Sequence, residues 1–258
     1  MFPYRDDNPH FLTPITTWAI IGLNALAWVL VQGLGSEPAL SQSVCTLGLI
    51  PGELLQTVPA GTAFPISPAH QCVITGTPAW HTTLTSMFLH GGWFHIIGNM
   101  WFLWIFGNNV EDSMGHGRFV VFYLLCGLAA AFVQVASAPG SGVPMVGASG
   151  AIGGVMGAYV VLYPRVHVHM LLILGFYVTT VAVPAVWMLG YWLLIQLVGG
   201  FGSLGAEGGG VAFWAHVGGF AAGVVLIPVF RSRRLLARHP YHGWSRPDPP
   251  TQSWRSVR

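Results

Sequence analysis

The sequence predicts an all-α, polytopic membrane protein built as a bundle of six transmembrane helices. Of its 258 residues, 53% are hydrophobic and only 7% are charged, whereas soluble domains carry about 25% charged residues. The apolar residues gather in runs of the length needed to cross about 30 Å of hydrocarbon. The net charge of +2 and the absence of lysine give no electrostatic support for nucleic-acid binding.

Six apolar runs, separated by polar or glycine-rich connections, are each read as one span, although the fourth is short. They comprise residues 14–34, 84–107, 117–137, 149–163, 181–199 and 209–230. The stretch 166–180, "VHVHMLLILGFYVTT", is apolar and β-branched, and we expect a re-entrant or interfacial segment there. The first run is too long for a signal peptide, follows Asp6 and Asp7, and lacks a small-residue cleavage site, so we expect it to remain as a span.

The arginines predict which way the chain crosses the membrane. With six spans, all ten arginines fall on one side, and the loop 35–83 on the other side has none. By the positive-inside rule, the arginine-bearing side is cytoplasmic. We therefore expect a cytoplasmic N-terminal tail (1–13), a membrane domain (14–232) and a cytoplasmic, proline-rich, disordered C-terminal tail (233–258), with loop 35–83 outside. The expected location is the inner membrane of a bacterial cell.

Polar side chains within the spans are the first functional candidates, because placing them in hydrocarbon is costly. His90, His95 and Asn99 lie in the second span, Ser149 opens the fourth, and His216 lies in the sixth. The helical rise predicts that His95 and His216 lie about 15 and 10 Å below the external face. If the preceding loop "APGSGVPMVGA" dips into the protein, Ser149 starts at a similar depth. Three separate spans would then supply polar groups to one layer.

This layer contains the parts of a nucleophilic site. A serine hydroxyl needs a base within hydrogen-bonding reach, and His216 is the best-placed base for Ser149. His95 and Asn99, spaced i, i+4, share one helix face and can donate to an oxyanion, as can the backbone at the start of the fourth helix. None of the eight acidic residues falls in this layer, so the sequence favours a Ser–His dyad over a triad.

Small residues predict that the fourth and sixth spans pack closely. Gly219 and Gly223 form a GxxxG pattern in the turns after His216, and such patterns let helix backbones approach each other. The fourth span offers a matching surface of Gly150, Gly153, Gly154 and Gly157. Close packing here would bring Ser149 Oγ toward the His216 ring.

Three motifs, in this order, resemble the rhomboid family of intramembrane serine proteases: "HGGWFHIIGN" with His95 and Asn99, "GASG" with Ser149, and "AHVGGFAAG" with His216. The resemblance covers residues 84–230. It implies a six-helix bundle with a short central fourth helix and a water-filled cavity open to the outside. It implies Ser149 as nucleophile, His216 as general base, and His95, Asn99 and the Ser149 amide as oxyanion donors. It also implies cleavage of transmembrane protein substrates near the external interface, among membrane lipids and without metal or cofactor.

Two positions depart from the family pattern. Many members carry a Trp-Arg pair in the first loop, where this chain has His81 and Thr82. Some members have a tyrosine one turn after the nucleophile that stacks on the base, where this chain has Gly153. What orients the ring of the base is therefore left open, with Phe213 or Trp214 as candidates.

Three further residues are expected to line the cavity or to have structural roles. His90 is either a structural hydrogen-bond donor near the cavity or a substrate contact, and Gly147 belongs to the same region. Glu111 is expected to tie the inner end of the second helix to the following loop or to Arg118.

The external loop contains two of the three cysteines, Cys45 and Cys72. An oxidising external compartment permits a disulfide, which would close the loop between them and order the external segment. We predict this bridge, with two free thiols, or a weak metal site with His70 and His81, as the alternatives. Cys126 lies within the third span and is expected to be a buried apolar residue.

Two other function classes remain. A catalytically inactive relative that binds transmembrane helices is disfavoured because every catalytic position is filled. A transporter would need charged residues near the membrane midplane or inverted repeats, and the sequence contains neither. The HExxH motif of zinc metalloproteases is also absent from the sequence.

Overall fold

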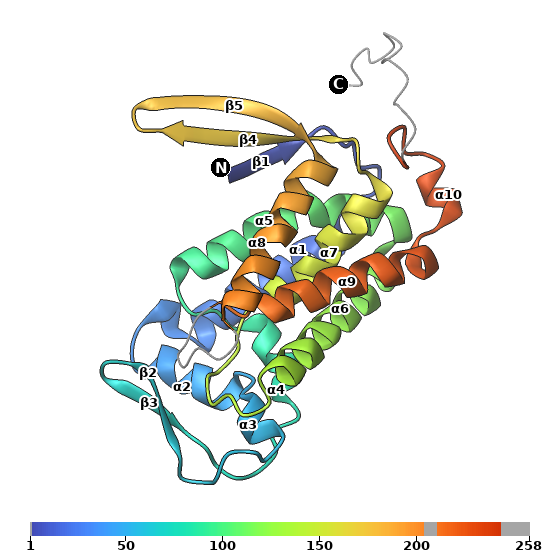
Figure 1. Cartoon of the computed structure of the whole chain (residues 1–258). Coiled ribbons are helices and arrows are strands. Elements are labelled where there is room, and N and C mark those ends of the chain that lie inside the picture. Colours follow the sequence, from blue (N-terminus) through green and yellow to red (C-terminus); the bar gives the residue numbers. More distant parts are fainter. Residues whose placement is uncertain (1, 204–210, 244–258) are drawn as a thin grey trace.

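The computed structural model describes residues 2–203 and 211–243, within which six helices pack into a bundle (Figure 1). These helices are α1 (Ile15–Leu30), α5 (Trp93–Met114), α6 (His116–Ser137), α7 (Ser149–Leu162), α8 (Ala185–Gly202) and α9 (Phe213–Phe230). Helix α7 lies at the centre, in contact with α5, α6, α8 and α9. Eleven of its 14 residues are buried, which explains why it is apolar on every face.

Among the residues that the structure describes, three helices are long and apolar enough to span a membrane: α6, α8 and α9. Helices α1 and α7 are apolar but shorter, with 16 and 14 residues. Helix α5 has 22 residues and a polar end. The protein is therefore a mostly helical membrane protein, and the crossing of the bilayer by all six helices stays a prediction.

The predicted second span, 84–107, is displaced toward the C-terminus in the structure. Its first residues belong instead to the one-turn helix α4 (Thr82–Thr85) and the 3₁₀ turn η2 (Ser86–Phe88), and α5 begins only at Trp93. The backbone is extended at Leu89, and the two glycines at 91–92 have low helix propensity. His95 therefore lies in the first turn of its helix rather than about 15 Å along a span.

Residues 166–180, expected to be a re-entrant or interfacial segment, form most of a β-hairpin. Strand β4 (His167–Leu174) pairs antiparallel with β5 (Tyr177–Pro184) around a turn at Gly175, where φ is 64°. Strand β1 (Phe2–Asp6) pairs with the other edge of β4 and completes a sheet of order β1-β4-β5. The extended conformation agrees with the β-branched and aromatic residues of this stretch, which favour extended backbone. The all-α prediction is therefore wrong, and the fold is mostly helical with a three-stranded sheet.

Both predicted tails pack against the membrane domain over part of their length. Strand β1 belongs to the sheet, and the Asp112 carboxylate accepts hydrogen bonds from the backbone amides of Phe11 and Leu12, at 2.6 and 2.9 Å. On the C-terminal side, a short helix α10 (Arg233–Leu236) is followed by His239, which is buried 3.0 Å from Asp112. The disorder predicted for the end of the chain concerns residues 244–258, which lie outside the described residues.

Glu111 makes the expected contact with the loop that was predicted to follow the second span, at His116, and further contacts that were not expected. Its buried carboxylate accepts hydrogen bonds from the backbone amides of Thr16 and Thr17 and from the Thr17 hydroxyl, at 2.7–2.9 Å. The same carboxylate lies 2.6 Å from His116 Nδ1. Arg118 donates instead to the Phe230 carbonyl oxygen. Glu111 therefore caps the start of α1, where a negative charge is favourable.

Residues 31–92 gather at the end of the bundle opposite to β1, β4, β5 and α10 (Figure 1). They form the turn η1 (Gly33–Gly35), helices α2 (Ala39–Leu47) and α3 (Pro51–Leu54), strands β2 (Ala63–Ser67) and β3 (His70–Val73), α4 and η2. We refer to residues 31–92 as the outer layer. The seven arginines within the described residues all lie at or beyond the opposite end of the bundle, which we refer to as the arginine-rich end. They are Arg5, Arg118, Arg165, Arg231, Arg233, Arg234 and Arg238.

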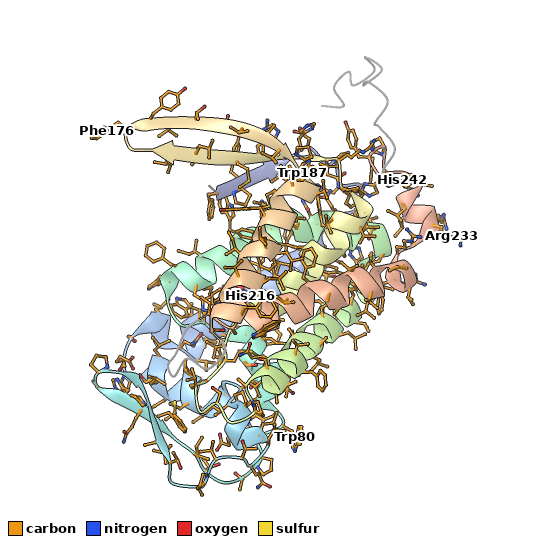
Figure 2. All side chains as sticks on the ribbon, viewed as in Figure 1. Trp80, Phe176, Trp187, His216, Arg233 and His242 are labelled. Atoms are coloured by element: carbon orange, nitrogen blue, oxygen red, sulfur yellow. A yellow bond between two sulfur atoms is a disulfide. The ribbon has the colours of Figure 1, made fainter. Side chains whose placement is uncertain are left out.

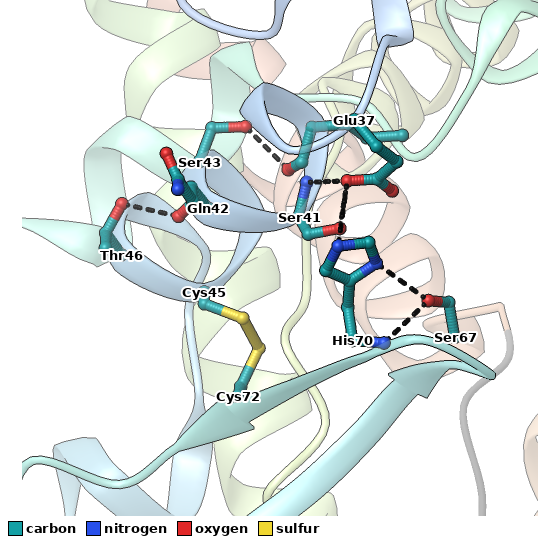
Figure 3. Close-up of a disulfide and its surroundings, with 10 residues drawn as sticks. Glu37, Ser41, Gln42, Ser43, Cys45, Thr46, Ser67, His70 and Cys72 are labelled. Atoms are coloured by element: carbon teal, nitrogen blue, oxygen red, sulfur yellow. Dashed lines mark hydrogen bonds and ion pairs between the residues drawn. A yellow bond between two sulfur atoms is a disulfide. The ribbon is translucent and has the colours of Figure 1, made fainter.

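A disulfide joins Cys45 on α2 to Cys72 on β3, with a Cα–Cα distance of 5.2 Å (Figure 3). Because both sulfurs are in this bond, neither the free-thiol alternative nor the metal alternative is adopted. His70 lies instead beside Ser67 and Glu37, at 3.3 and 3.9 Å. The bridge thus connects the helical and strand parts of the outer layer. Cys126 is free and buried, as expected.

Candidate functional site

Three helices carry a candidate residue in their first turn, and these turns meet below the outer layer. Ser149 is the first residue of α7, His95 is the third residue of α5, and His216 is the fourth residue of α9. All three side chains are half-buried. The predicted layer of polar groups therefore exists because three helices start together, rather than because one span carries a histidine deep inside it.

Ser149 and His216 contact each other directly. Ser149 Oγ lies 2.7 Å from His216 Nε2. This is a normal distance for a hydrogen bond that the hydroxyl donates to an unprotonated ring nitrogen. A serine so placed can lose its proton to the imidazole as it attacks an electrophile.

The glycines predicted to line the crossing of α7 and α9 are responsible for this contact. A β-carbon placed on Gly219 would lie 1.8 Å from the Gly150 carbonyl oxygen, and one on Gly223 would lie 1.9 Å from the Gly154 carbonyl oxygen. A β-carbon on Gly157 would lie 2.2 Å from the Phe220 carbonyl oxygen, and one on Gly153 would lie 3.0 Å from the His216 carbonyl oxygen. Any larger residue would separate the two helices.

Gln196 on α8 holds the other side of the His216 ring, and the sequence analysis missed it. Gln196 Oε1 lies 2.7 Å from His216 Nδ1, while its amide nitrogen donates to the Trp192 carbonyl oxygen at 3.3 Å. Because an amide oxygen only accepts, Nδ1 carries the ring proton and leaves Nε2 free to accept from the serine. Gln196 is only 7% exposed. Its polarity within an apolar span was the signal that could have identified it.

The aromatic neighbour of the base is Trp192, not the residues expected. The centroids of the Trp192 and His216 rings are 5.8 Å apart, with an angle of 36° between their planes. Trp214 instead packs edge-on against Phe201, and the Phe213 ring covers Gly199. The base is therefore positioned by α8, through one hydrogen bond and one aromatic contact.

His95 approaches the serine from the opposite side. Its Nδ1 accepts a hydrogen bond from the Gly91 amide at 3.1 Å, so its proton is on Nε2. A β-carbon placed on Gly147 would lie only 2.8 Å from this nitrogen and 3.4 Å from Ser149 Oγ. Gly147 also has φ of +130°, which L-residues rarely adopt. The Nε2–H donor thus faces the backbone that leads into Ser149, and only glycine leaves room for it.

Asn99 and His90 support His95 rather than reaching the serine. The Asn99 amide nitrogen donates to the His95 carbonyl oxygen at 2.7 Å, within α5. The His90 ring is fully buried and lies edge-on to His95, with centroids 5.2 Å apart. Gln32 fixes the His90 backbone through two hydrogen bonds, at 2.7 and 2.8 Å. Of the expected oxyanion donors, the structure therefore directs His95 toward the serine more clearly than Asn99.

A family model for the Rhomboid domain matches residues 77–233, more than half of the chain. The chain belongs to the rhomboid family. The match begins just before α4 and ends in α10, so it includes every residue of the candidate site. Strand β1 and the Cys45–Cys72 bridge precede the matched rhomboid region.

Individual rhomboid relatives match shorter stretches. Rhomboid-like protein 11, chloroplastic, from Arabidopsis thaliana is 40% identical over 30% of the chain, and Rhomboid protease GluP from Bacillus subtilis (strain 168) is 40% identical over 33%. RHOMBOID-like protein 4 from Arabidopsis thaliana is 30% identical over 67% of the chain. The matched stretches make up only 27%, 17% and 38% of these relatives, so the chain spans well under two thirds of their length.

Proposed function

We propose that this rhomboid-family protein is an intramembrane serine endopeptidase with Ser149 and His216 as its catalytic dyad. The 2.7 Å contact between Ser149 Oγ and His216 Nε2 carries the proposal, because a hydroxyl bonded to an imidazole is the arrangement that activates serine in proteases. Similarity to a relative named as a rhomboid protease supports the same reaction. The chemistry requires neither metal nor cofactor.

The proposed reaction uses Nε2 of His216 first as a general base and then as a general acid, while Nδ1 keeps its proton. Nε2 takes the hydroxyl proton as Ser149 Oγ bonds to the substrate carbonyl carbon, and the carbonyl oxygen becomes an oxyanion. The imidazolium then gives this proton to the leaving nitrogen, the C–N bond breaks, and an acyl-enzyme remains. Water repeats the two steps, which releases the carboxylate product and restores the serine.

The oxyanion would be stabilised by groups that the fold holds in place. The Ser149 amide is at the positive end of the α7 dipole, and His95 Nε2–H lies beside it across Gly147. We assign His95 as the side-chain donor. Asn99 would act mainly by holding the His95 backbone, which places it one step from the oxyanion.

The proposed substrates are transmembrane proteins, cut near the membrane face opposite the arginine-rich end. The arginines favour a cytoplasmic location for their own end, so both termini would be cytoplasmic and the site would open to the other side. A formed helix keeps its carbonyls in i→i−4 hydrogen bonds. The substrates should therefore contain glycine, proline or other helix-weakening residues near the cut. The inner membrane of a bacterial cell fits this proposal, and relatives named as chloroplastic and mitochondrial point to equivalent membranes.

A cleavage assay with purified protein tests the function. Detergent-purified protein is incubated with a labelled single-span substrate, alongside Ser149→Ala, His216→Ala and the double variant. Each single variant should abolish cleavage while retaining its fold, and the double variant should be little worse, because a nucleophile and its base act as a unit. Cleavage by folded Ser149→Ala would exclude the mechanism. Binding of substrate by the wild type without cleavage would favour an inactive, helix-binding relative.

A further inference from the structure

The β4–β5 hairpin extends sideways beyond the helix bundle at its arginine-rich end (Figure 1). The third strand, β1, pairs with β4 only as far as Leu171. From there to the tip, residues 172–179 form a ladder of only two strands. An isolated two-stranded hairpin is marginally stable in water. The outer half of the hairpin therefore needs another surface to stabilise it.

The strand register shows which way each face of the hairpin points. Val168 and Met170 are buried in the core of the bundle, at 0% and 6% exposure, so the face that carries them is turned toward the helices. Side chains on one face alternate along a strand. The same face continues outward through Leu172 and, on β5, Tyr177. The other face carries His167 and His169 at its base, where His169 lies 2.8 Å from Asp7.

The tip of the hairpin is apolar on both faces. Phe176 is fully exposed, and Ile173, Tyr177 and Val178 are 59–66% exposed. Figure 2 shows the Phe176 ring at the end of the hairpin, directed away from every other element. No charged residue occurs between Arg165 and Glu207 in the sequence. The exposed residues Ile173, Phe176, Tyr177 and Val178 thus give the tip an uncharged surface of large side chains.

The exposed side of α8 continues this apolar surface. Helix α8 follows β5 directly, and Trp187 and Tyr191 in its first two turns are 72% and 60% exposed. Leu194 and Val198 extend the exposed row along the same membrane-spanning helix. Tryptophan and tyrosine are enriched where a membrane meets water. The hairpin therefore projects at the level of the membrane surface, from the point where α8 enters the hydrocarbon.

We propose that residues 172–179 dock into the lipid leaflet at the arginine-rich end. Ile173, Phe176, Tyr177 and Val178, from both faces of the tip, enter the boundary between headgroups and acyl chains, while His167 and His169 at the base of the hairpin remain in water. The occupant of the surface is lipid, because the apolar surface is continuous with that of a spanning helix. This proposal is independent of the proposed proteolytic function.

Spin labelling in vesicles tests the docking. Phe176→Cys and Val178→Cys are made in a Cys126→Ala background, labelled with a nitroxide and reconstituted into vesicles of phosphatidylcholine and phosphatidylglycerol. Collisions with oxygen, which enters lipid, are compared with collisions with a water-soluble nickel chelate. Leu194→Cys on α8 is the lipid reference, and His167→Cys is the water reference.

Labels at 176 and 178 are expected to favour oxygen to nearly the same degree as the label at 194. A nickel accessibility equal to that at 167 would overturn the proposal. Spin–spin broadening between two copies, with labels shielded from both reagents, would also overturn it, because β5 would then be pairing with a second copy through its free edge.

Hydroxyl-radical footprinting of the unsubstituted protein in the same vesicles removes any dependence on variants that fail to fold. Modification of Phe176 and Tyr177 is compared with that of the same residues in the isolated peptide. We expect strong protection at both residues and little protection at His167. Modification of Phe176 at the rate of the free peptide would overturn the proposal.

Discussion

The two ring nitrogens of His216 contact two different partners, and the contact with Gln196 determines which nitrogen carries the proton. Nε2 meets Ser149, whereas Nδ1 meets the Gln196 amide oxygen, each at 2.7 Å. The amide oxygen keeps the proton on Nδ1 in the resting site and can accept from the imidazolium when that forms. In a Ser–His–Asp triad a carboxylate does this. Here a neutral amide takes its place, so its effect on turnover should be smaller.

We predict that Gln196→Leu lowers kcat by about tenfold and leaves KM unchanged. Leaving the Nδ1–H donor of His216 without its buried partner costs about 1–3 kcal/mol, and about 1.4 kcal/mol corresponds to tenfold in rate. Gln196→Glu should move the acid limb of the pH–rate profile to higher pH, because a carboxylate stabilises the imidazolium. Measurement of kcat and KM across pH checks both results.

Gln134→Leu is the matched control for Gln196. Gln134 Oε1 accepts a hydrogen bond from the Ala215 amide at 3.1 Å, one residue before the base. Its loss should lower stability without moving the pH–rate profile. Equal profiles and equal kcat for wild type and both Gln196 variants would mean that the amide only fills space.

At the scale of elements, the crossing of α7 and α9 tolerates no added methyl group. A β-carbon on Gly223 would overlap the Gly154 carbonyl oxygen at 1.9 Å, which is backbone and cannot move aside alone. We predict that Gly223→Ala lowers the melting temperature in detergent and abolishes cleavage. Gly190 on α8 has no atom within 4 Å of such a carbon. Gly190→Ala should leave the melting temperature unchanged or raise it. A stable, active Gly223→Ala would contradict the packing argument.

The link between β1 and the bundle should depend on pH. The Tyr159 hydroxyl donates a hydrogen bond to the Asp6 carboxyl group, and burial raises the pKa of Asp6 from 3.8 to about 7. The folded state thus holds a proton that the unfolded chain releases near pH 4. Stability from this group is fully present below the unfolded pKa and is lost as the pH rises through the folded pKa.

The wild type should therefore melt at lower temperature at pH 8 than at pH 5, and Asp6→Asn should reduce this difference. Asp7, the next residue, lies 2.8 Å from His169 on β4, so Asp7→Asn is measured in parallel as the control. Thermal melts in detergent at the two pH values decide the matter. An identical pH dependence in wild type and Asp6→Asn would refute the assignment to Asp6.

At the scale of the whole molecule, the features that could be predicted from the sequence are those that short local motifs determine. The contact of Ser149 with His216 could be predicted because glycine patterns require the close approach of two helices. The start of α5 could not, since hydropathy does not register the break at Gly91 and Gly92. The hairpin was missed because a short apolar run fits a strand or a helix equally well. Gln196 was overlooked although the cost of polar groups in hydrocarbon applies to it as much as to His216.

At the scale of the whole molecule, backbone hydrogen bonds connect the outer layer to the loop that precedes the candidate site. Leu49 and Met145 exchange two backbone hydrogen bonds, at 2.7 and 3.0 Å, and the Gly52 amide donates to the Ser141 carbonyl oxygen at 2.8 Å. These bonds attach the layer to the loop that leads into Ser149. The Cys45–Cys72 bridge therefore acts on a segment that continues to the nucleophile, although the bridge itself contacts no residue of the candidate site.

We predict that replacing both bridge cysteines with serine lowers the stability of the outer layer and leaves the chemistry intact. In the chain-entropy model, closing a loop with a sequence separation of 27 residues is worth about 3–4 kcal/mol. Hydrogen exchange of residues 45–75 should accelerate, and the temperature of inactivation should fall. At low temperature kcat should stay within about twofold of the wild type, which corresponds to a difference of about 0.4 kcal/mol in activation free energy. Reduction of the wild type should reproduce the variant, whereas Cys126→Ala should not. A large loss of kcat in the folded variant would instead mean that the bridge holds the loop before Ser149 in its reactive position.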